Sequence, residues 1–215
     1  EGTHFTLLYK GKQYPVDIPL TGKFNVYNSL AAIAALLAEG MPLKNICKHL
    51  AHAPQIPGRF ERVDAGQEFT IIVDYAHTPD GLENVLNTAK EIAQNRLITV
   101  FGCGGDRDKG KRPIMGKIAG TYSDYAVITS DNPRTEDPMA IIAQVEAGMK
   151  EVSQQYEVEE NRRHAIEIAL RMAKKGDVVM IAGKGHEDYQ LVNGKVLNFD
   201  DRKVAREIIE SLKQK

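Results

Sequence analysis

From residue 69 onward, short apolar runs alternate with segments whose apolar residues recur at helical spacing. Each run has the length of a buried strand, and the runs lie at residues 69–73, 97–101, 125–129 and 178–182. Strands that alternate with helices predict an α/β fold with a doubly wound, mostly parallel sheet. The pair Asn193-Gly194 between two short apolar runs predicts an antiparallel hairpin, which we expect at the edge of that sheet.

The first 56 residues have a different pattern. They predict a hairpin with strands at 5–8 and 13–18, followed by helices at 25–39 and 42–52. So few elements make a thin core, and we expect this segment to be the tail end of a larger domain. The proline-rich stretch at 54–58 is the best linker candidate, so we divide the chain into residues 1–56 and 57–215.

The overall composition excludes several classes of protein. The net charge is −1 over 215 residues, so no bulk electrostatic argument favours nucleic acid or a membrane surface. No apolar run reaches the roughly 18 residues of a membrane span. The two cysteines are far apart, which indicates no disulfide framework and favours a reducing cytoplasm. We expect a cytoplasmic monomer and, because the chain opens on Glu1 inside a predicted strand, a fragment of a longer protein.

Polar motifs follow all four predicted strands of the second segment. The carboxyl ends of parallel strands meet at one edge of a sheet, which is where ligands bind in open α/β folds. We therefore expect the four loops to line one crevice. They are residues 74–80, 102–112, 131–134 and 183–188.

The third of these loops begins Asp131-Asn132-Pro133-Arg134. It offers a carboxylate, an amide and a planar guanidinium, which suits a bound carboxylate or phosphate. The alternative is a loop that only caps the next helix through Asp137. That alternative explains the end of the loop and leaves its first four residues unexplained.

The second loop resembles a P-loop and differs at one decisive position. Residues 105–111 match G-x-x-x-x-G-K, but Arg112 stands where a P-loop has the Ser or Thr that binds magnesium. We interpret the segment as a different anion cradle, with a flexible solvated loop as the alternative. Its cations are Arg107, Lys109, Lys111 and Arg112.

The remaining reactive side chains carry no signal of a metal centre or a nucleophile. His77 and His186 have no metal-ligand spacing. Cys103 has no activating partner in the sequence, so we expect a small buried residue. We assign no catalytic residue and no metal ligand to this chain.

Taken together, these motifs resemble those of the Mur ligase family, and in particular its diaminopimelate-adding branch. The resemblance implies three domains in the complete enzyme. Residues 1–56 would be the C-terminal remnant of the central α/β ATP-binding domain, and residues 57–215 the C-terminal Rossmann-like amino-acid-binding domain. The matching stretches are residues 22–28, 58–61, 74–80, 102–113, 131–134 and 183–189.

The resemblance also implies a reaction. Family enzymes use ATP and Mg²⁺ to convert a carboxylate into an acyl phosphate, which an amine then attacks. Here meso-diaminopimelate would be added to UDP-MurNAc-L-Ala-D-Glu during peptidoglycan precursor synthesis. The family's P-loop, magnesium ligands and carbamylated lysine lie upstream of the matched region. We therefore expect this chain alone to bind ligand without turnover, and to meet the UDP-MurNAc-dipeptide only through the missing domains.

Individual residues take roles from the same resemblance. The distal end of meso-diaminopimelate is a zwitterion, so Arg107 and Arg134 would pair with its carboxylate, and Asp131 and Glu187 with its ammonium. The full set implied for the amino acid is Arg107, Asp131, Asn132, Pro133, Arg134, Gly183 and Glu187. The set implied for ATP is Asn28, Arg59 and Asp74.

Two other hypotheses remain open from the sequence. One is a small α/β phosphotransferase that uses residues 105–111 as its phosphate loop, against which Arg112 and the lack of a Walker-type magnesium partner argue. The other is a non-catalytic amino-acid-binding module. ATP hydrolysis by this chain would distinguish the phosphotransferase from the others.

Overall fold

The computed structural model describes residues 2–213, which form two compact units that divide between Ile56 and Pro57. In the first unit, β1 (Thr3–Tyr9) and β2 (Lys12–Ile18) form an antiparallel hairpin. Helices α1 (Lys23–Ala38) and α2 (Leu43–Leu50) follow, as predicted. Its apolar cluster has Ile33, Leu43 and Ile46 as buried members, and Val16 and Ile18 of β2 are buried as well, so this unit buries little apolar surface of its own.

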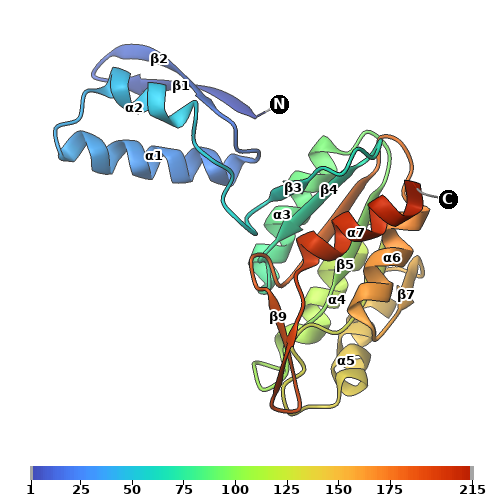
Figure 1. Cartoon of the computed structure of the whole chain (residues 1–215). Helices are drawn as coiled ribbons and strands as arrows, with labels where there is room; N and C mark the ends of the chain where they lie inside the picture. The colour runs from blue at the N-terminus through green and yellow to red at the C-terminus, as the bar shows by residue number, and fades with distance from the viewer. Residues whose placement is uncertain (1, 214–215) are drawn as a thin grey trace. The chain divides into compact units, whose positions relative to one another are not determined.

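The second unit is built on a six-stranded sheet with the order β3-β4-β8-β5-β6-β7 (Figure 1). Its strands are parallel except for the antiparallel edge strand β3. Their bounds are β3 (Glu61–Val63), β4 (Thr70–Asp74), β5 (Leu97–Phe101), β6 (Tyr125–Ile128), β7 (Tyr156–Val158) and β8 (Val178–Ala182).

The central strand β8 explains why the apolar runs were so clear in the sequence. All five of its residues are buried, because β8 has a parallel neighbour on each side and helices on both faces. Such strands are apolar throughout instead of alternating. The four predicted strands therefore appear within one residue of their expected ends, and the mostly parallel sheet is confirmed.

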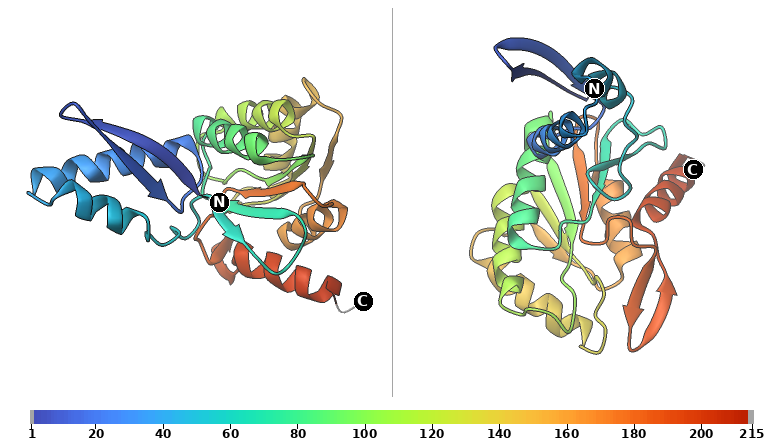
Figure 2. Two further views of the ribbon diagram at one scale, coloured as in Figure 1. Left: turned by 90° about the horizontal axis from the view of Figure 1, so that it is seen from above. Right: turned by 90° about the vertical axis from the view of Figure 1, so that its left-hand side faces the viewer.

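Helices cover both faces of this sheet (Figure 2). One face carries α3 (Pro79–Ile92), α4 (Lys111–Tyr122) and α5 (Pro138–Lys150), and the other α6 (Arg162–Met172) and α7 (Asp201–Lys213). The Asp137 side chain caps α5 as predicted, since it accepts from the Met139 N–H, and the Asn161 side chain caps α6 by accepting from the His164 N–H. No helix within residues 2–213 is long and apolar enough to cross a membrane.

The predicted hairpin forms, but as a sheet of its own. Strands β9 (Tyr189–Val192) and β10 (Lys195–Asn198) pair with each other, and the antiparallel edge of the main sheet is β3 instead. Both β3 and β7 are only three residues long, which is too short to show a periodicity in the sequence.

Helices α4 and α5 touch through two glycines. A Cβ atom added at Gly116 would lie 1.9 Å from the carbonyl oxygen of Val145, and one added at Gly148 would lie 1.8 Å from that of Pro113. Both obstacles are backbone atoms, which no side-chain rotation can move. The two helices can therefore approach this closely only with glycine at both positions.

We expect Gly116→Ala to destabilise the second unit, although alanine favours helices over glycine by about 1 kcal/mol. Overpacking costs about 1–3 kcal/mol, which exceeds that gain. Urea unfolding measures the difference, with Thr121→Ala on the exposed side of the same helix as the control. A stabilised Gly116→Ala protein would show that the helices separate freely.

Candidate functional site

The four polar loops meet at one edge of the sheet, as the sequence predicts. Strands β4, β8, β5 and β6 all end there, and the loops after them line a cleft of about 710 Å³. Each loop contributes to the lining, which includes Tyr75, His77, Gly104, Arg107, Lys111, Asp131, Asn132, Arg134, Gly183 and Glu187.

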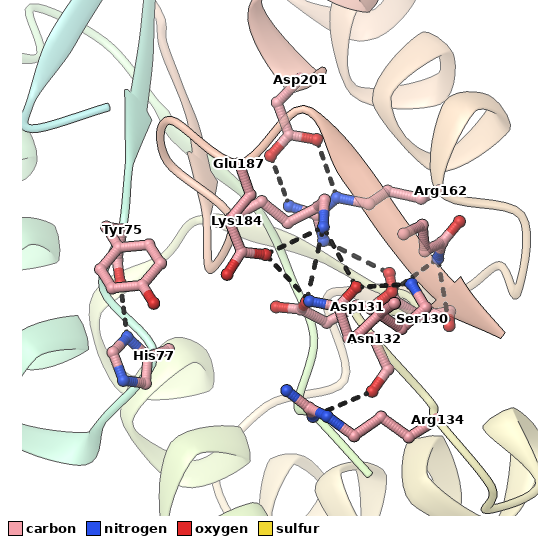
Figure 3. Close-up of polar contacts among 12 residues, drawn as sticks. Tyr75, His77, Ser130, Asp131, Asn132, Arg134, Arg162, Lys184, Glu187 and Asp201 are labelled. Carbon is pink, nitrogen blue, oxygen red and sulfur yellow. Dashed lines mark hydrogen bonds and ion pairs between the residues drawn. The ribbon is translucent and has the colours of Figure 1, made fainter. Parts of the chain in front are cut away.

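The floor of this cleft is a polar cluster of Asp131, Asn132, Lys184 and Glu187 (Figure 3). The Asn132 amide donates to Glu187 Oε2 at 2.9 Å. The Lys184 ammonium lies 3.2 Å from the same oxygen, 3.4 Å from Asn132 Oδ1 and 4.0 Å from Asp131 Oδ1. Lys184 is fully buried, so these contacts replace the hydration of its charge.

The β9–β10 hairpin holds the Asp131–Arg134 loop in place. Gln190 Nε2 donates to the Asp131 carbonyl oxygen at 2.6 Å, and the Leu191 N–H donates to Asn132 Oδ1 at 2.8 Å. The Arg134 N–H in turn donates to the Leu191 carbonyl oxygen at 2.9 Å. The hairpin thus binds the loop mainly through backbone groups.

A buried ion pair lies beneath the floor. The Arg162 guanidinium on α6 donates twice to the Asp201 carboxylate on α7, at 2.8 and 2.7 Å, and both side chains are fully buried. Its remaining donors reach the carbonyl oxygens of Ala182 at 3.1 Å and Ser130 at 3.4 Å. Arg162 therefore connects two helices to the ends of β8 and β6. Removing one partner of such a pair typically costs about 3–5 kcal/mol.

Burial raises the pKa of the Asp131 carboxyl group, which is only 6% exposed. The positive charges of Arg162 and Lys184 oppose this rise, and the negative charges of Asp201 and Glu187 add to it. The ionisation of the floor is therefore a balance among five buried or half-buried charges.

Arg134 has an uncommon backbone conformation, with φ of 54°. Residues other than glycine rarely adopt this left-handed region, and where they do the surrounding structure must hold them there. Its guanidinium donates to the Gly105 carbonyl oxygen at 2.8 Å and lines the cleft. A Cβ atom at Gly105 would lie 1.9 Å from the Pro133 carbonyl oxygen, so the two loops pack together without a side chain between them.

Two further cations lie along the rim of the cleft. Arg107 is exposed and donates a hydrogen bond of 3.0 Å to the carbonyl oxygen of the neighbouring Asp106. Lys111 donates to the His77 carbonyl oxygen at 2.6 Å across the cleft. Arg107 can therefore turn toward a bound anion at little cost, whereas Lys111 also joins two loops.

Arg112 does not belong to the anion cradle, and this part of the sequence prediction is wrong. Its side chain is fully buried and forms hydrogen bonds of 2.8 and 3.0 Å with the two Glu136 carboxylate oxygens. Because Glu136 also accepts from the Asp106 N–H at 2.6 Å, the pair joins α4 to the loop after β5 and to the loop that carries Arg134. Arg112 is therefore occupied inside the protein, which also removes support for a phosphotransferase loop.

The residues predicted for ATP have different surroundings. The Asp74 carboxylate is 5% exposed and accepts from the N–H groups of Phe60 at 2.6 Å and Ala76 at 2.7 Å, while its burial raises its pKa. Exposed Arg59 lies with its guanidinium 4.7 Å from the centre of the Tyr75 ring. Asn28 is exposed on α1 in the first unit, where its amide donates to Asn25 Oδ1 at 3.3 Å.

The structure gives no reason to assign a metal site or a nucleophile here. Among residues 2–213, no three His, Cys, Asp or Glu side chains are grouped to hold a metal ion. Cys103 is buried, as predicted, and burial raises the pKa of its thiol to about 12. A thiol with such a pKa is an inert core group at neutral pH.

Sequence reasoning missed the buried charges beneath the cleft. Lys184 lies within a motif that the sequence singled out, between two glycines at the end of a strand, yet it had no assigned role. Arg162 and Asp201 each look like an ordinary charge in the first turn of a helix. Only the packing of α6 and α7 beneath the loops brings them together.

The arrangement suits a small zwitterion. Carboxylates and an amide form the floor of the cleft, while the Arg134 guanidinium lies beside it and Arg107 stands on the rim. An ammonium and a carboxylate on one ligand carbon could therefore bind side by side, each with charge-assisted hydrogen bonds.

Comparison with known families agrees with the fold. A family profile described as "Mur ligase, glutamate ligase domain" matches residues 58–185, and one described as "Mur ligase middle domain" matches residues 1–36. Since the first match covers more than half of the chain, the chain belongs to the Mur ligase family.

Individual relatives give a narrower comparison. The UDP-N-acetylmuramoyl-L-alanyl-D-glutamate–2,6-diaminopimelate ligase of Syntrophomonas wolfei is 55% identical over 210 residues, which is 97% of this chain and 43% of that protein. The ligase of the same name from Clostridium botulinum is 50% identical, over 98% of this chain and 44% of that protein. A solved structure with that name aligns with a TM-score of 0.72 at 41% identity, covering 98% of this chain and 43% of the other. The chain thus spans less than half the length of these relatives.

We expect Glu136→Gln to flatten the acid dependence of stability. Its hydrogen bonds with Arg112 lower the pKa of Glu136 to about 2, from a usual value near 4.5. The stability that this carboxylate contributes is therefore present above pH 4.5 and is lost as the pH falls toward 2. Urea unfolding between these pH values measures the slope, with exposed Glu151→Gln as the control. Equal slopes in the wild-type and Glu136→Gln proteins would contradict the assignment.

Proposed function

We propose that this chain is the C-terminal part of an ATP-dependent ligase that adds meso-diaminopimelate to UDP-MurNAc-L-Ala-D-Glu through an acyl phosphate. The cleft would bind the incoming amino acid. Residues 57–215 would form the amino-acid-binding domain, and residues 1–56 the end of the central ATP-binding domain. The relatives' names and the family matches support this assignment.

The single observation that carries the proposal is the position of Arg134 beside Asp131, Asn132 and Glu187 in one cleft. Meso-diaminopimelate carries a carboxylate next to its distal ammonium, and L-lysine has only the ammonium. Arg134 and Arg107 would bind that carboxylate, and Asp131 and Glu187 the ammonium. L-lysine would leave Arg134 without an anionic partner, which is the kind of mismatch that polar sites reject strongly.

The other predicted residues would support these contacts. A Cβ atom at Gly183 would lie 2.6 Å from Asp131 Oδ2, so glycine there leaves room for the carboxylate and for the ligand beside it. Buried Pro133 would set the path of the backbone between Asn132 and Arg134.

ATP would supply the phosphoryl group that activates the dipeptide carboxylate, with Mg²⁺ bound in the upstream part of the enzyme. Arg59 is exposed, with its guanidinium over the Tyr75 ring, and would contact the nucleotide directly. Asp74 would act by holding the backbone at Phe60 and Ala76, since its oxygens accept from those groups. Asn28 stays a predicted ATP contact in the first unit.

We expect this chain to bind meso-diaminopimelate and to bind L-lysine at least about tenfold more weakly, because a charge-assisted hydrogen bond contributes about 1.5–3 kcal/mol. Isothermal titration calorimetry of the chain with each ligand measures the difference. Equal affinities would remove the role assigned to Arg134, and binding of neither would contradict a preformed site in this chain.

We expect Arg134→Lys to lower the affinity for meso-diaminopimelate about tenfold or more, since lysine keeps the charge but loses the planar fork of donors. Arg163→Lys is the matched control, because Arg163 is exposed and pairs with Glu207 on the opposite face of the sheet. In an enzyme that includes the upstream domains, the same change should raise the KM for the amino acid far more than the KM for ATP. Equal effects on both would assign Arg134 to a general structural role.

A further inference from the structure

Lys184 is a buried cation at the floor of the cleft that the proposed ligand contacts do not use. It lies in the loop after β8, where Gly183 and Gly185 both have positive φ values. The side chain is fully buried, which is rare for lysine and requires compensating partners. Those partners are three residues assigned to the ligand, namely Asp131, Asn132 and Glu187.

The charges around Lys184 do not cancel. Arg162 and Asp201 form a closed, doubly hydrogen-bonded pair that leaves no net charge. Lys184 is then shared between the carboxylates of Asp131 and Glu187, at 4.0 and 3.2 Å. With both carboxylates ionised, one negative charge remains uncompensated at the floor of the cleft, which matches one ligand ammonium.

Lys184 also fixes the direction of these groups. Its ammonium and the Asn132 amide both donate to Glu187 Oε2, so that oxygen is held on the protein side (Figure 3). Because Asn132 Oδ1 accepts from Lys184 and from the Leu191 N–H, the amide has one orientation in this network. The Lys184 ammonium further lies 5.5 Å from the centre of the Tyr189 ring, which limits its movement on that side.

We infer that Lys184 is a positioning residue for amino-acid recognition: its buried ammonium orients Asn132 and Glu187 and balances one of two carboxylate charges, so that the floor accepts a single ammonium. This inference rests on the proposed function for the identity of the ligand. The effect of Lys184 on the carboxylates is a property of the protein alone.

The first test therefore needs no ligand. Asp131 faces Arg162 from α6, Asp201 from α7, and Lys184 and Glu187 from the loop after β8. Since Lys184 opposes the raised pKa of Asp131, Lys184→Met should move the titration midpoint of the Asp131 carboxyl to higher pH. NMR of protein labelled with ¹³C at the aspartate carboxyl groups measures that midpoint. Lys175→Met, which removes an exposed charge 3.8 Å from Glu68, is the matched control and should leave it unchanged.

The second test adds the ligand. Lys184→Met should weaken meso-diaminopimelate binding about tenfold or more at neutral pH. Its loss of affinity on acidification should begin at a higher pH than in the wild-type protein, because the ammonium binds the ionised floor. Lys184→Gln, which keeps a donor without the charge, should show the same shift in pH with a smaller loss of affinity.

The outcomes separate the two proposals. If the wild-type chain binds no meso-diaminopimelate but Lys184→Met moves the Asp131 midpoint, the preformed ligand site of the proposed function fails and the charge role of Lys184 stands. If the midpoint is unchanged, or the ligand binds Lys184→Met as tightly as wild type, the inference about Lys184 is overturned.

A variant that removes one charge of each sign guards against misfolding. Lys184→Met combined with Glu187→Gln leaves the net charge of the floor unaltered, so no extra carboxylate is buried without a partner. Its Asp131 midpoint should lie above that of Glu187→Gln alone and close to that of the wild-type protein. Equal midpoints in the double and single variants would overturn the inference as well.

Discussion

The cleft depends on buried positive charge beneath its loops. Arg162 joins α6 and α7 to the carbonyl groups at the ends of β8 and β6, and it does so from a fully buried position beside Asp201. The Arg162 and Asp201 side chains are both 0% exposed, so water does not reach them and each donor needs a protein acceptor. The same guanidinium that closes the core therefore fixes the loops whose side chains line the cleft.

The loops above the Arg162–Asp201 pair are held in place by contacts between the loops themselves. The β9–β10 hairpin binds the Asp131–Arg134 loop through Leu191, and Gly105 allows the second loop to lie directly against Pro133. Arg134 keeps an unfavourable φ because hydrogen bonds on both sides of it hold the chain there. A cleft built this way has its side chains oriented in advance, which would lower the entropic cost of binding a ligand.

Much of this architecture could be predicted from the sequence because buried strands have a clear apolar pattern. Elements without such a pattern could not be predicted. Buried parallel strands such as β5 and β8 are apolar at every position, so their ends and the polar loops after them are visible without a structure. The three-residue strands β3 and β7 have no such pattern. Arg112 pairs with Glu136, 24 residues away, and Lys184 contacts Asn132 in another loop. A local sequence motif does not reveal whether a cation faces solvent or a buried carboxylate.

The position of β8 has a consequence for how the protein is made. This strand lies between β4 and β5 in the sheet, although about 75 residues of chain separate it from β5. During synthesis, β4 and β5 emerge early and have no strand between them until residue 178 has left the ribosome. Only then can β8 join β4 to β5, and the loop that carries Lys184 and Glu187 follows immediately. The cleft is therefore completed only when β8 enters the sheet, and a nascent chain that stops before β8 can pair β5 with β6 but lacks one of the four loops.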